Sequence, residues 1–215
     1  EKLAREPFTG VFMVPTHFQA IFGLERAVLD THRGQARALR TIMSNSAALP
    51  QAVKEKIVDY WGEGLLHETY GFTEAGVVTN LTPADQLRKP GSVGSAFPLV
   101  DVQLLDDHGI PVARGEVGEI FVSSPWMFNG YWQQPEASAA ALRDGWLWTG
   151  DIGRLDEDGF LTLLDRSKDL VICGGNNVYP REVEEVLLQH AAVVEVAVIG
   201  RPDAQWGEAL VAYVV

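Results

Sequence analysis

Apolar residues in the first third of the chain follow two alternating spacings. Between residues 18 and 29 they recur every three or four positions, which predicts an amphipathic helix with Thr16 as its N-cap. Pro50 suits the first turn of a second helix. Short continuous apolar runs at residues 39–43 and 65–69 predict buried strands. Strands that alternate with helices in this way are typical of a parallel sheet covered by helices.

The pattern changes at Gly76, from which short apolar runs are separated by turn residues. A short helix is predicted from Pro135, and Asp-Glu-Asp-Gly at residues 156–159 predicts a hairpin turn. The same acidic turn lacks the ligand spacing and the later glutamate of a calcium loop. The expected strands lie at residues 100–105, 117–122, 152–155 and 160–164. This middle region therefore predicts a small antiparallel barrel or a distorted sheet.

A third pattern begins near Lys168, where single strands alternate with one helix. The chain is therefore predicted to be a mixed α/β protein, with a large domain over residues 1–166 and the start of a small one over 167–215. Within the large domain we expect the parallel sheet in residues 1–75 and the antiparallel part in 76–166. The expected elements of the small domain are a strand at 170–172, a loop at 174–177, a helix from Pro180, and β-rich segments at 193–199 and 210–215.

Composition narrows the classes of function. Hydrophobic residues make up 47% of the 215, enough for a sizeable core, and the formal net charge is −12. This acidic excess disfavours nucleic acid and anionic membrane surfaces as partners, because both attract clustered lysine and arginine. One cysteine, Cys173, excludes an internal disulfide and fits a reducing compartment such as the cytoplasm. No apolar run approaches the length of a membrane span.

The segment Tyr-Gly-Phe-Thr-Glu at residues 70–74 follows a buried strand, a position where α/β sheets bind ligands. Gly71 allows close approach to the backbone, and Tyr70 could stack on a flat ring. Thr73 could donate to a phosphate, and Glu74 could hold Mg²⁺. The structural alternative is a turn in which Thr73 caps a helix and Glu74 lies at the positive end of that helix.

Three further segments carry side chains that suit a nucleotide but also have structural interpretations. Asp151, beside Gly150, could accept two ribose hydroxyls, or it is an ordinary turn aspartate. Arg166, in the charged stretch 165–169, could fork to a phosphate or a ribose, or the stretch is a solvated linker. The loop 174–177 could let a cofactor approach, or it is only a turn. Each segment by itself leaves both interpretations open.

The joint order of these segments resembles the adenylate-forming superfamily, which includes acyl-CoA synthetases, the adenylation domains of peptide synthetases, and beetle luciferases. Residues 70–74 match the pattern Tyr-Gly-x-Thr-Glu, and residues 145–151 match Gly-Trp-x-x-Thr-Gly-Asp. Residues 165–172, Gly174-Gly175, Pro180 and Glu182 match the stretch that joins the two domains of the family, except that Asp165 stands where Gly is usual. The remaining matches are Gly118-Glu119 and Gly130-Tyr131. The resemblance covers the whole chain.

The resemblance implies a nucleotide site for ATP and Mg²⁺. Tyr70 is expected to stack on adenine, with Ser46, Ala47 and Ala48 on the other face of the base. Ser46 is a mild departure, because that segment is usually rich in Gly. Asp151 is expected to hold the ribose hydroxyls.

The residues closest to the chemistry follow from the same resemblance. Thr73 is expected to contact the α-phosphate and Glu74 to bind the metal. Arg166 is expected beside the ribose. Lys168 occupies the hinge about which the small domain swings between two half-reactions. We therefore predict Thr73, Glu74, Arg166 and Lys168 as the catalytic residues.

The resemblance also places CoA and the acyl group. Gly174 and Gly175 are expected to face the tunnel for the thiol of CoA. His17 falls where an aromatic residue often borders the acyl pocket, although it is equally explained as a residue in the first turn of a helix. Small residues at Gly71, Ala75 and Gly76 would leave room for an aryl acid or a medium-chain fatty acid. The predicted acyl pocket comprises His17, Thr69, Gly71, Gly76 and Val77.

Among the functions of this family, an acyl-CoA synthetase is favoured. Trp206-Gly207-Glu208 is frequent in CoA ligases, and no Asp lies near residues 16–18 to bind the amine of a peptide-synthetase substrate. An adenylation domain that loads a carrier protein, or a non-catalytic nucleotide-binding homologue, remains as an alternative. The expected partners are a small carboxylic acid, ATP and CoA, and a homo-oligomer is left open.

Two segments that the family uses do not occur in this sequence: the phosphate loop ending in Lys, and the adenylation Lys near the C-terminus. The pattern also starts without an initiating Met and stops within a predicted strand. We therefore expect an internal fragment of a longer protein, and we expect this chain alone not to catalyse adenylation.

Overall fold

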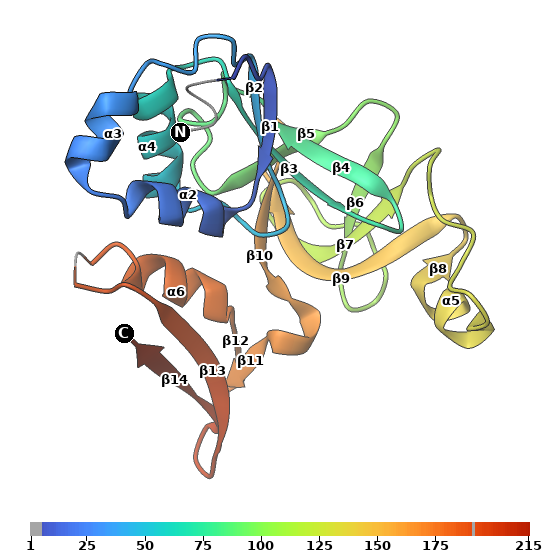
Figure 1. Cartoon of the computed structure of the whole chain (residues 1–215). Helices are drawn as coiled ribbons and strands as arrows, with labels where there is room; N and C mark the ends of the chain where they lie inside the picture. The colour runs from blue at the N-terminus through green and yellow to red at the C-terminus, as the bar shows by residue number, and fades with distance from the viewer. Residues whose placement is uncertain (1–5, 191) are drawn as a thin grey trace.

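The fold is that of a computed structural model, which describes residues 6–190 and 192–215. Its described residues form two sheets, joined through β10 and the short segment that follows it (Figure 1). The large sheet has ten strands, on the path β1-β2-β3-β4-β5-β10-β9-β7-β6, with β8 paired to β9. These strands are β1 (Gly10–Met13), β2 (Thr41–Ser44), β3 (Leu66–Phe72), β4 (Gly76–Leu81), β5 (Ser92–Ala96), β6 (Asp101–Leu105), β7 (Val117–Ser123), β8 (Leu142–Arg143), β9 (Trp146–Leu155) and β10 (Phe160–Arg166).

The first three strands are parallel, as the sequence predicted. Helices α2 (Pro15–Phe22), α3 (Arg26–His32) and α4 (Gln51–Trp61) gather on one side of them (Figure 1). The core between helices and strands contains Phe18 and Ile42, both fully buried. Burial of these apolar side chains is the main force that holds helix and sheet together.

The helix expected from Thr16 is wrong in two respects. It begins one residue earlier, at Pro15, so Val14 occupies the N-cap position. The backbone N–H of Val14 donates to Nδ1 of His17 over 3.2 Å, which replaces the hydroxyl cap that the sequence suggested. The apolar periodicity also spans two helices, because the chain turns at residues 23–25 before α3 begins.

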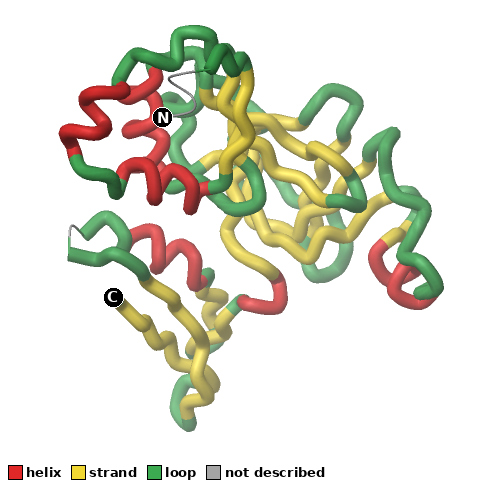
Figure 2. Tube along the Cα trace, viewed as in Figure 1, coloured by secondary structure: helices red, strands yellow, loops and turns green. Residues whose placement is uncertain are grey.

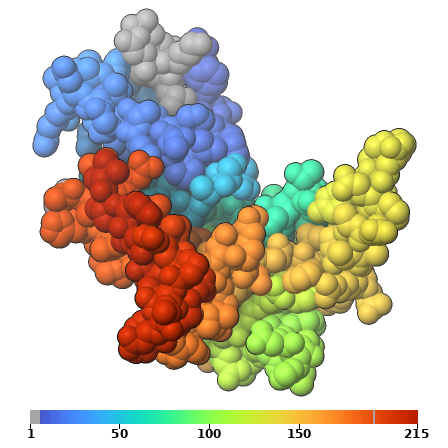
Figure 3. Space-filling model, turned by 90° about the horizontal axis from the view of Figure 1, so that it is seen from below, coloured from blue at the N-terminus to red at the C-terminus, as the bar shows by residue number. Residues whose placement is uncertain are grey.

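The middle of the chain extends the same sheet with antiparallel strands. The β3–β4 hairpin joins the parallel and antiparallel parts, and the register shifts at several points, including Leu163/Asp165 of β10. Of the two predicted alternatives, the distorted sheet therefore describes this region. The predicted hairpin at residues 156–159 is confirmed: Gly159 donates to the carbonyl of Asp156 over 2.9 Å. Helix α5 (Pro135–Ala141) begins at the predicted proline and lies beside β8 (Figure 1), in the yellow part of the molecule that protrudes in Figure 3.

The second sheet contains four strands in the order β12-β11-β14-β13, with one helix packed beside it (Figure 2). We call residues 167–215 the small unit. The predicted loop at 174–177 is only partly right, because Asn176 and Asn177 belong to a strand that pairs with β11. The elements are η1 (Ser167–Asp169), β11 (Val171–Cys173), β12 (Asn176–Val178), α6 (Pro180–Leu187), β13 (Val196–Asp203) and β14 (Gly207–Val214). Over residues 6–190 and 192–215, no helix has both the length and the apolar character needed to cross a membrane.

Candidate functional site

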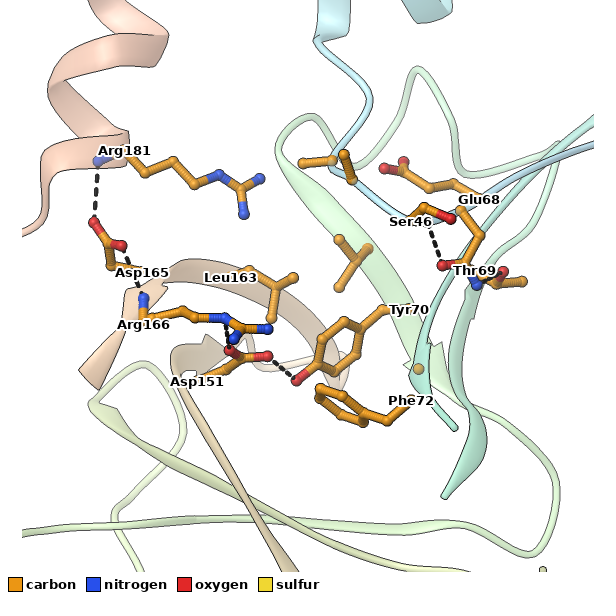
Figure 4. A pocket seen from close by; sticks show the side chains of 15 residues that line it. Ser46, Glu68, Thr69, Tyr70, Phe72, Asp151, Leu163, Asp165, Arg166 and Arg181 are labelled. Carbon is orange, nitrogen blue, oxygen red and sulfur yellow. Dashed lines mark hydrogen bonds and ion pairs between the residues drawn. The ribbon is translucent and has the colours of Figure 1, made fainter. Parts of the chain in front are cut away.

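A cavity of about 270 Å³ opens where β3, β9 and β10 meet the loop after β2 (Figure 4). It lies between the large sheet and the first turn of α6, so both parts of the chain contribute to it. The lining consists of Asn45, Ser46, Ala47, Ala48, Glu68, Thr69, Tyr70, Gly71, Phe72, Val93, Asp151, Leu163, Asp165, Arg166 and Arg181. Eight of the predicted site residues therefore lie together: Ser46, Ala47, Ala48, Thr69, Tyr70, Gly71, Asp151 and Arg166.

Tyr70, Asp151 and Arg166 form one connected group at the base of this cavity. The phenolic hydroxyl of Tyr70 donates to Oδ2 of Asp151 over 2.8 Å. Nε of Arg166 lies 3.2 Å from Oδ1 of the same carboxylate. Tyr70 and Asp151 are both buried, whereas the arginine side chain is 57% exposed. These two contacts hold the carboxylate of Asp151 in a fixed orientation in the wall of the cavity.

Burial and neighbouring charges oppose each other at Asp151. Burial raises the pKa of this carboxyl above its ordinary value, while the Tyr70 hydrogen bond and the charge of Arg166 act in the opposite direction. Burial also raises the pKa of Tyr70 well above its ordinary range, and the adjacent carboxylate adds to this effect. Tyr70 therefore remains a neutral hydrogen-bond donor at physiological pH.

The loop after β2 lines the cavity and is anchored at both ends. The Asn45 amide donates to Oγ1 of Thr69 over 2.8 Å, and the backbone N–H of Leu49 donates to Oε1 of Glu68 over 2.9 Å. Ser46 has φ of +77°, in the left-handed region that favours glycine. This conformation suits glycine, in agreement with the expectation that this segment is rich in Gly. Here the side-chain oxygen of Asn45 accepts the N–H of Ser46 and supports the strained backbone.

A buried ion pair behind this loop was missed by sequence reasoning. Nζ of Lys54 lies 2.5 Å from Oε2 of Glu68, with side chains only 1% and 2% exposed. Lys54 also donates to the carbonyl of Ser92 over 3.3 Å. The only sequence signal is that Lys54 precedes Ile57 by three positions, which places both on the buried face of α4. Its partner lies on a different element, so no local pattern reveals the pair.

Thr73 and Glu74 lie outside the cavity lining, in the turn between β3 and β4. The alternative in which Thr73 caps a helix is wrong, because the chain returns as an antiparallel strand. The hydroxyl of Tyr131 donates to Oε1 of Glu74 over 2.8 Å, and the backbone N–H of Phe128 donates to the Glu74 carbonyl over 2.8 Å. Both bonds orient Glu74 and leave Oε2 for another ligand.

This arrangement fits a magnesium ion that arrives with a nucleotide. Mg²⁺ in proteins commonly uses one or two carboxylates together with phosphate oxygens and water. Within the described residues, no group of three or more His, Cys, Asp or Glu side chains could hold a metal by itself. The single oriented carboxylate of Glu74 is therefore suited to share an ion with phosphates.

The residues expected at the hinge and thiol tunnel also lie apart from the cavity. Lys168 is exposed in η1. Gly174 donates its N–H to the carbonyl of Trp206 over 2.8 Å. A Cβ at Gly174 would come within 2.7 Å of the Trp206 ring, so only glycine fits beside that indole. Gly175, next in the turn, is exposed.

The predicted acyl pocket is only partly assembled. Thr69 and Gly71 line the cavity, whereas His17, Gly76 and Val77 do not. His17 is exposed in the first turn of α2. The room expected beside Gly76 is filled by Trp126, whose Cδ1 lies 2.5 Å from where a Cβ would be.

Family models match both parts of the chain. Residues 1–132 match the model described as AMP-binding enzyme, and residues 182–215 match the AMP-binding enzyme C-terminal domain. The chain therefore belongs to the AMP-binding enzyme family. Together with the cavity, this membership defines the class of protein as adenylate-forming.

Particular relatives are ligases of acyl groups. The chain is 43% identical over 215 residues to the long-chain-fatty-acid–CoA ligase of Yersinia pestis, and the match covers all of this chain and 37% of that protein. It is 46% identical over 179 residues to the corresponding ligase of Bacillus subtilis, covering 83% of this chain and 32% of that protein. It is 42% identical over 207 residues to a feruloyl-CoA synthase of an Amycolatopsis species. This match covers 95% of the present chain and 40% of that protein. The chain thus spans about a third to two fifths of the length of these relatives.

Solved structures share the fold. An amide bond synthetase from Marinactinospora thermotolerans has a TM-score of 0.91 at 37% identity, covering 99% of this chain and 43% of that one. An o-succinylbenzoate CoA synthetase from Bacillus subtilis, in complex with its acyl-adenylate intermediate, has a TM-score of 0.87 at 33% identity. The match covers 99% of this chain and 42% of that one. The same enzyme has been solved with ATP and magnesium ion.

Proposed function

We propose that the full-length protein is an acyl-CoA ligase that activates a carboxylic acid with ATP and transfers the acyl group to CoA. The observation that carries the proposal is the cavity in which Tyr70, Asp151 and the loop 45–48 face one another. This arrangement suits an adenosine nucleotide, in a chain 43% identical along its whole length to a long-chain-fatty-acid–CoA ligase.

The proposed nucleotide pose follows from the lining. Adenine stacks on the ring of Tyr70 and is covered by Ala47 and Ala48, while the ribose hydroxyls donate to the carboxylate of Asp151. The exposed guanidinium of Arg166 lies beside the ribose. Stacking and hydrogen bonding at opposite ends of the nucleoside would fix its orientation.

The proposed first half-reaction takes place beyond Gly71. The carboxylate oxygen of the substrate attacks the α-phosphorus of ATP, an acyl-adenylate forms, and pyrophosphate leaves. Thr73 donates to the α-phosphate, and Glu74 would hold Mg²⁺, which would offset the negative charge that gathers on the phosphates. The step needs no covalent nucleophile from the protein.

In the proposed second half-reaction, the thiol of CoA attacks the acyl carbonyl and AMP leaves. Lys168 is the hinge for the movement between the half-reactions, and Gly174 and Gly175 face the thiol, as the family resemblance implies. An amine is a second candidate acceptor, because the amide bond synthetase has a similar fold at 37% identity. A thiol on a carrier protein is a third candidate acceptor, supported only by the family resemblance.

The proposed acid is a fatty acid or an aromatic acid. Relatives named for long-chain fatty acids and for ferulate are similarly close in identity, at 43% and 42%. Thr69 and Gly71 are the predicted acyl-pocket residues that line the cavity. We further propose that the reaction takes place in the cytoplasm, where ATP and CoA are available. The single cysteine is compatible with that reducing compartment.

The test measures AMP release from ATP and Mg²⁺ by the full-length protein, with pooled fatty and aryl acids, with and without CoA. CoA-dependent AMP release with thioester formation supports the ligase. Pyrophosphate exchange without thioester, or amide formation with added amines, would assign another acceptor. If no pool of acids gives AMP release, although the protein binds AMP, the result would favour a non-catalytic homologue. The 215-residue chain assayed alone is expected to be inactive, and a rate near that of the full-length protein would refute this expectation.

A further inference from the structure

Arg181 reaches the cavity from the small unit, although no sequence motif singled it out. It is the second residue of α6, and it lines the cavity together with Tyr70, Asp151 and Arg166. Its side chain extends from the helix toward the cavity (Figure 4). Only 25% of this side chain is exposed, which is low for a surface arginine.

The guanidinium of Arg181 is only partly engaged within the protein. Its Nε lies 3.3 Å from Oε1 of Glu185, one turn further along the same helix. This contact uses only the Nε–H donor of the five N–H donors of the group. Among the described residues, the two terminal nitrogens form no ion pair. Arg166, the other arginine of the cavity, is already paired with Asp151. Arg181 therefore keeps its four terminal N–H donors for a ligand, as does Arg166, which contacts Asp151 only through Nε.

Asp165 fixes the position of Arg181 through the backbone. Oδ2 of Asp165 accepts the N–H of Arg181 over 3.1 Å, and Oδ1 accepts the N–H of Arg166 over 2.8 Å. One carboxylate at the end of β10 thus binds the first turn of α6 and the residue that faces Asp151. Because the bond between Asp165 and Arg181 crosses from the large sheet to the small unit, Arg181 lies at the cavity only while α6 keeps this position.

The part of the cavity that Arg181 lines is the part that suits a base and a ribose. Tyr70, Asp151 and the loop 45–48 surround it, whereas Thr73 and Glu74 lie outside. We propose that Arg181 binds the nucleoside part of the bound nucleotide, and that Asp165 positions it there by holding the start of α6. This inference rests on the proposed nucleotide site and adds a residue from the small unit to it.

The experiment compares AMP and adenosine binding by isothermal titration in the full-length protein. Arg181→Gln is expected to weaken both ligands by about three- to tenfold, the size expected for losing a partly exposed hydrogen bond from a charged group. Arg181→Lys should recover part of the loss. Arg201→Gln is the matched control, because Arg201 is an exposed arginine of the small unit that does not line the cavity. Its affinities are expected to equal those of the wild type.

The role of Asp165 is tested by a double-mutant cycle. Asp165→Ala should weaken AMP binding, and Arg181→Gln should have a smaller effect in that background than in the wild type. Thermal unfolding of each variant checks that the fold is intact.

Each other outcome overturns a stated part of the inference. Unchanged binding by Arg181→Gln removes Arg181 from the site while the nucleotide site stands. A loss for AMP but not for adenosine assigns Arg181 to the phosphate and overturns the nucleoside contact. Additive effects of the two substitutions remove the positioning role of Asp165. Failure of the wild-type protein to bind AMP would overturn both the proposed function and this inference.

Discussion

The hydroxyl of Tyr70 donates a 2.8 Å hydrogen bond to the carboxylate of Asp151, a residue 81 positions later in the chain. The two residues belong to separate sequence motifs, and the fold brings them together through β3 and β9 at the base of one cavity. A single tyrosine thus supplies an aromatic face to the cavity and a donor to the buried carboxylate. These two contributions can be separated by mutation.

Tyr70→Phe keeps the ring and removes only the hydroxyl. We expect AMP affinity to fall by about tenfold, because Asp151 loses the donor that orients it. Tyr70→Ala should lose a further ~1–3 kcal/mol of binding free energy through lost stacking on the base. Titration calorimetry with AMP distinguishes the two steps. Equal affinities of the phenylalanine variant and the wild type would show that the hydrogen bond does not support binding.

The affinity for AMP is expected to depend on acid pH through Asp151. Burial raises the pKa of this carboxyl, and the ribose hydroxyls donate to its ionised form. As the pH falls through the raised pKa, Asp151 becomes protonated and binding should weaken. This loss should begin at a higher pH than it would for an aspartate with an ordinary pKa. Asp151→Asn should bind weakly at every pH and lack this acid decline. A decline that persists in Asp151→Asn would assign it to another group.

The same carboxyl has a defined effect on stability. Because its pKa is higher in the folded than in the unfolded state, the folded protein binds the proton more tightly. The contribution of Asp151 to the free energy of unfolding should therefore fall as the pH rises from the unfolded to the folded pKa. Urea unfolding of wild type and Asp151→Asn across this interval measures the difference.

Tyr131→Phe tests the orientation of the proposed magnesium ligand. The phenol donates to Oε1 of Glu74, and this bond raises the pKa of Tyr131. Without it, we expect the Mg²⁺ concentration for half-maximal adenylation to rise by about tenfold, in line with the loss of groups that orient metal ligands. AMP binding without Mg²⁺ should not change. The control is Trp132→Phe, because Trp132 is 86% exposed; the same Mg²⁺ shift in both variants would contradict the assignment.

The buried pair of Lys54 and Glu68 is expected to be essential to the loop that lines the cavity at residues 45–48. Lys54→Met leaves a buried carboxylate unpaired and should lower the free energy of unfolding by about 3–5 kcal/mol. Glu68→Gln keeps an oxygen for the Leu49 N–H, and the double variant Lys54→Met/Glu68→Gln should recover part of the loss. Urea unfolding gives the coupling energy. Additive losses would indicate that the two charges do not stabilise each other.

Local patterns in the sequence determined much of this protein. Alternating helical and strand spacings predicted the parallel strands, and the acidic turn at residues 156–159 predicted its hairpin, because both depend on neighbours a few positions apart. The motifs that contain Tyr70 and Asp151 also identified the family, since each motif is contiguous. Eight of the residues predicted for the site line one cavity.

The tertiary structure decided what depends on contacts between distant elements. Lys54 is buried because Glu68 of β3 lies opposite it, and the space at Gly76 is filled by Trp126 from 50 positions away. Arg181 reaches the cavity because Asp165 holds the start of α6. Charge pairing, side-chain volume and the placement of a helix are set by three-dimensional packing, and the spacing of residues along a chain does not encode them locally.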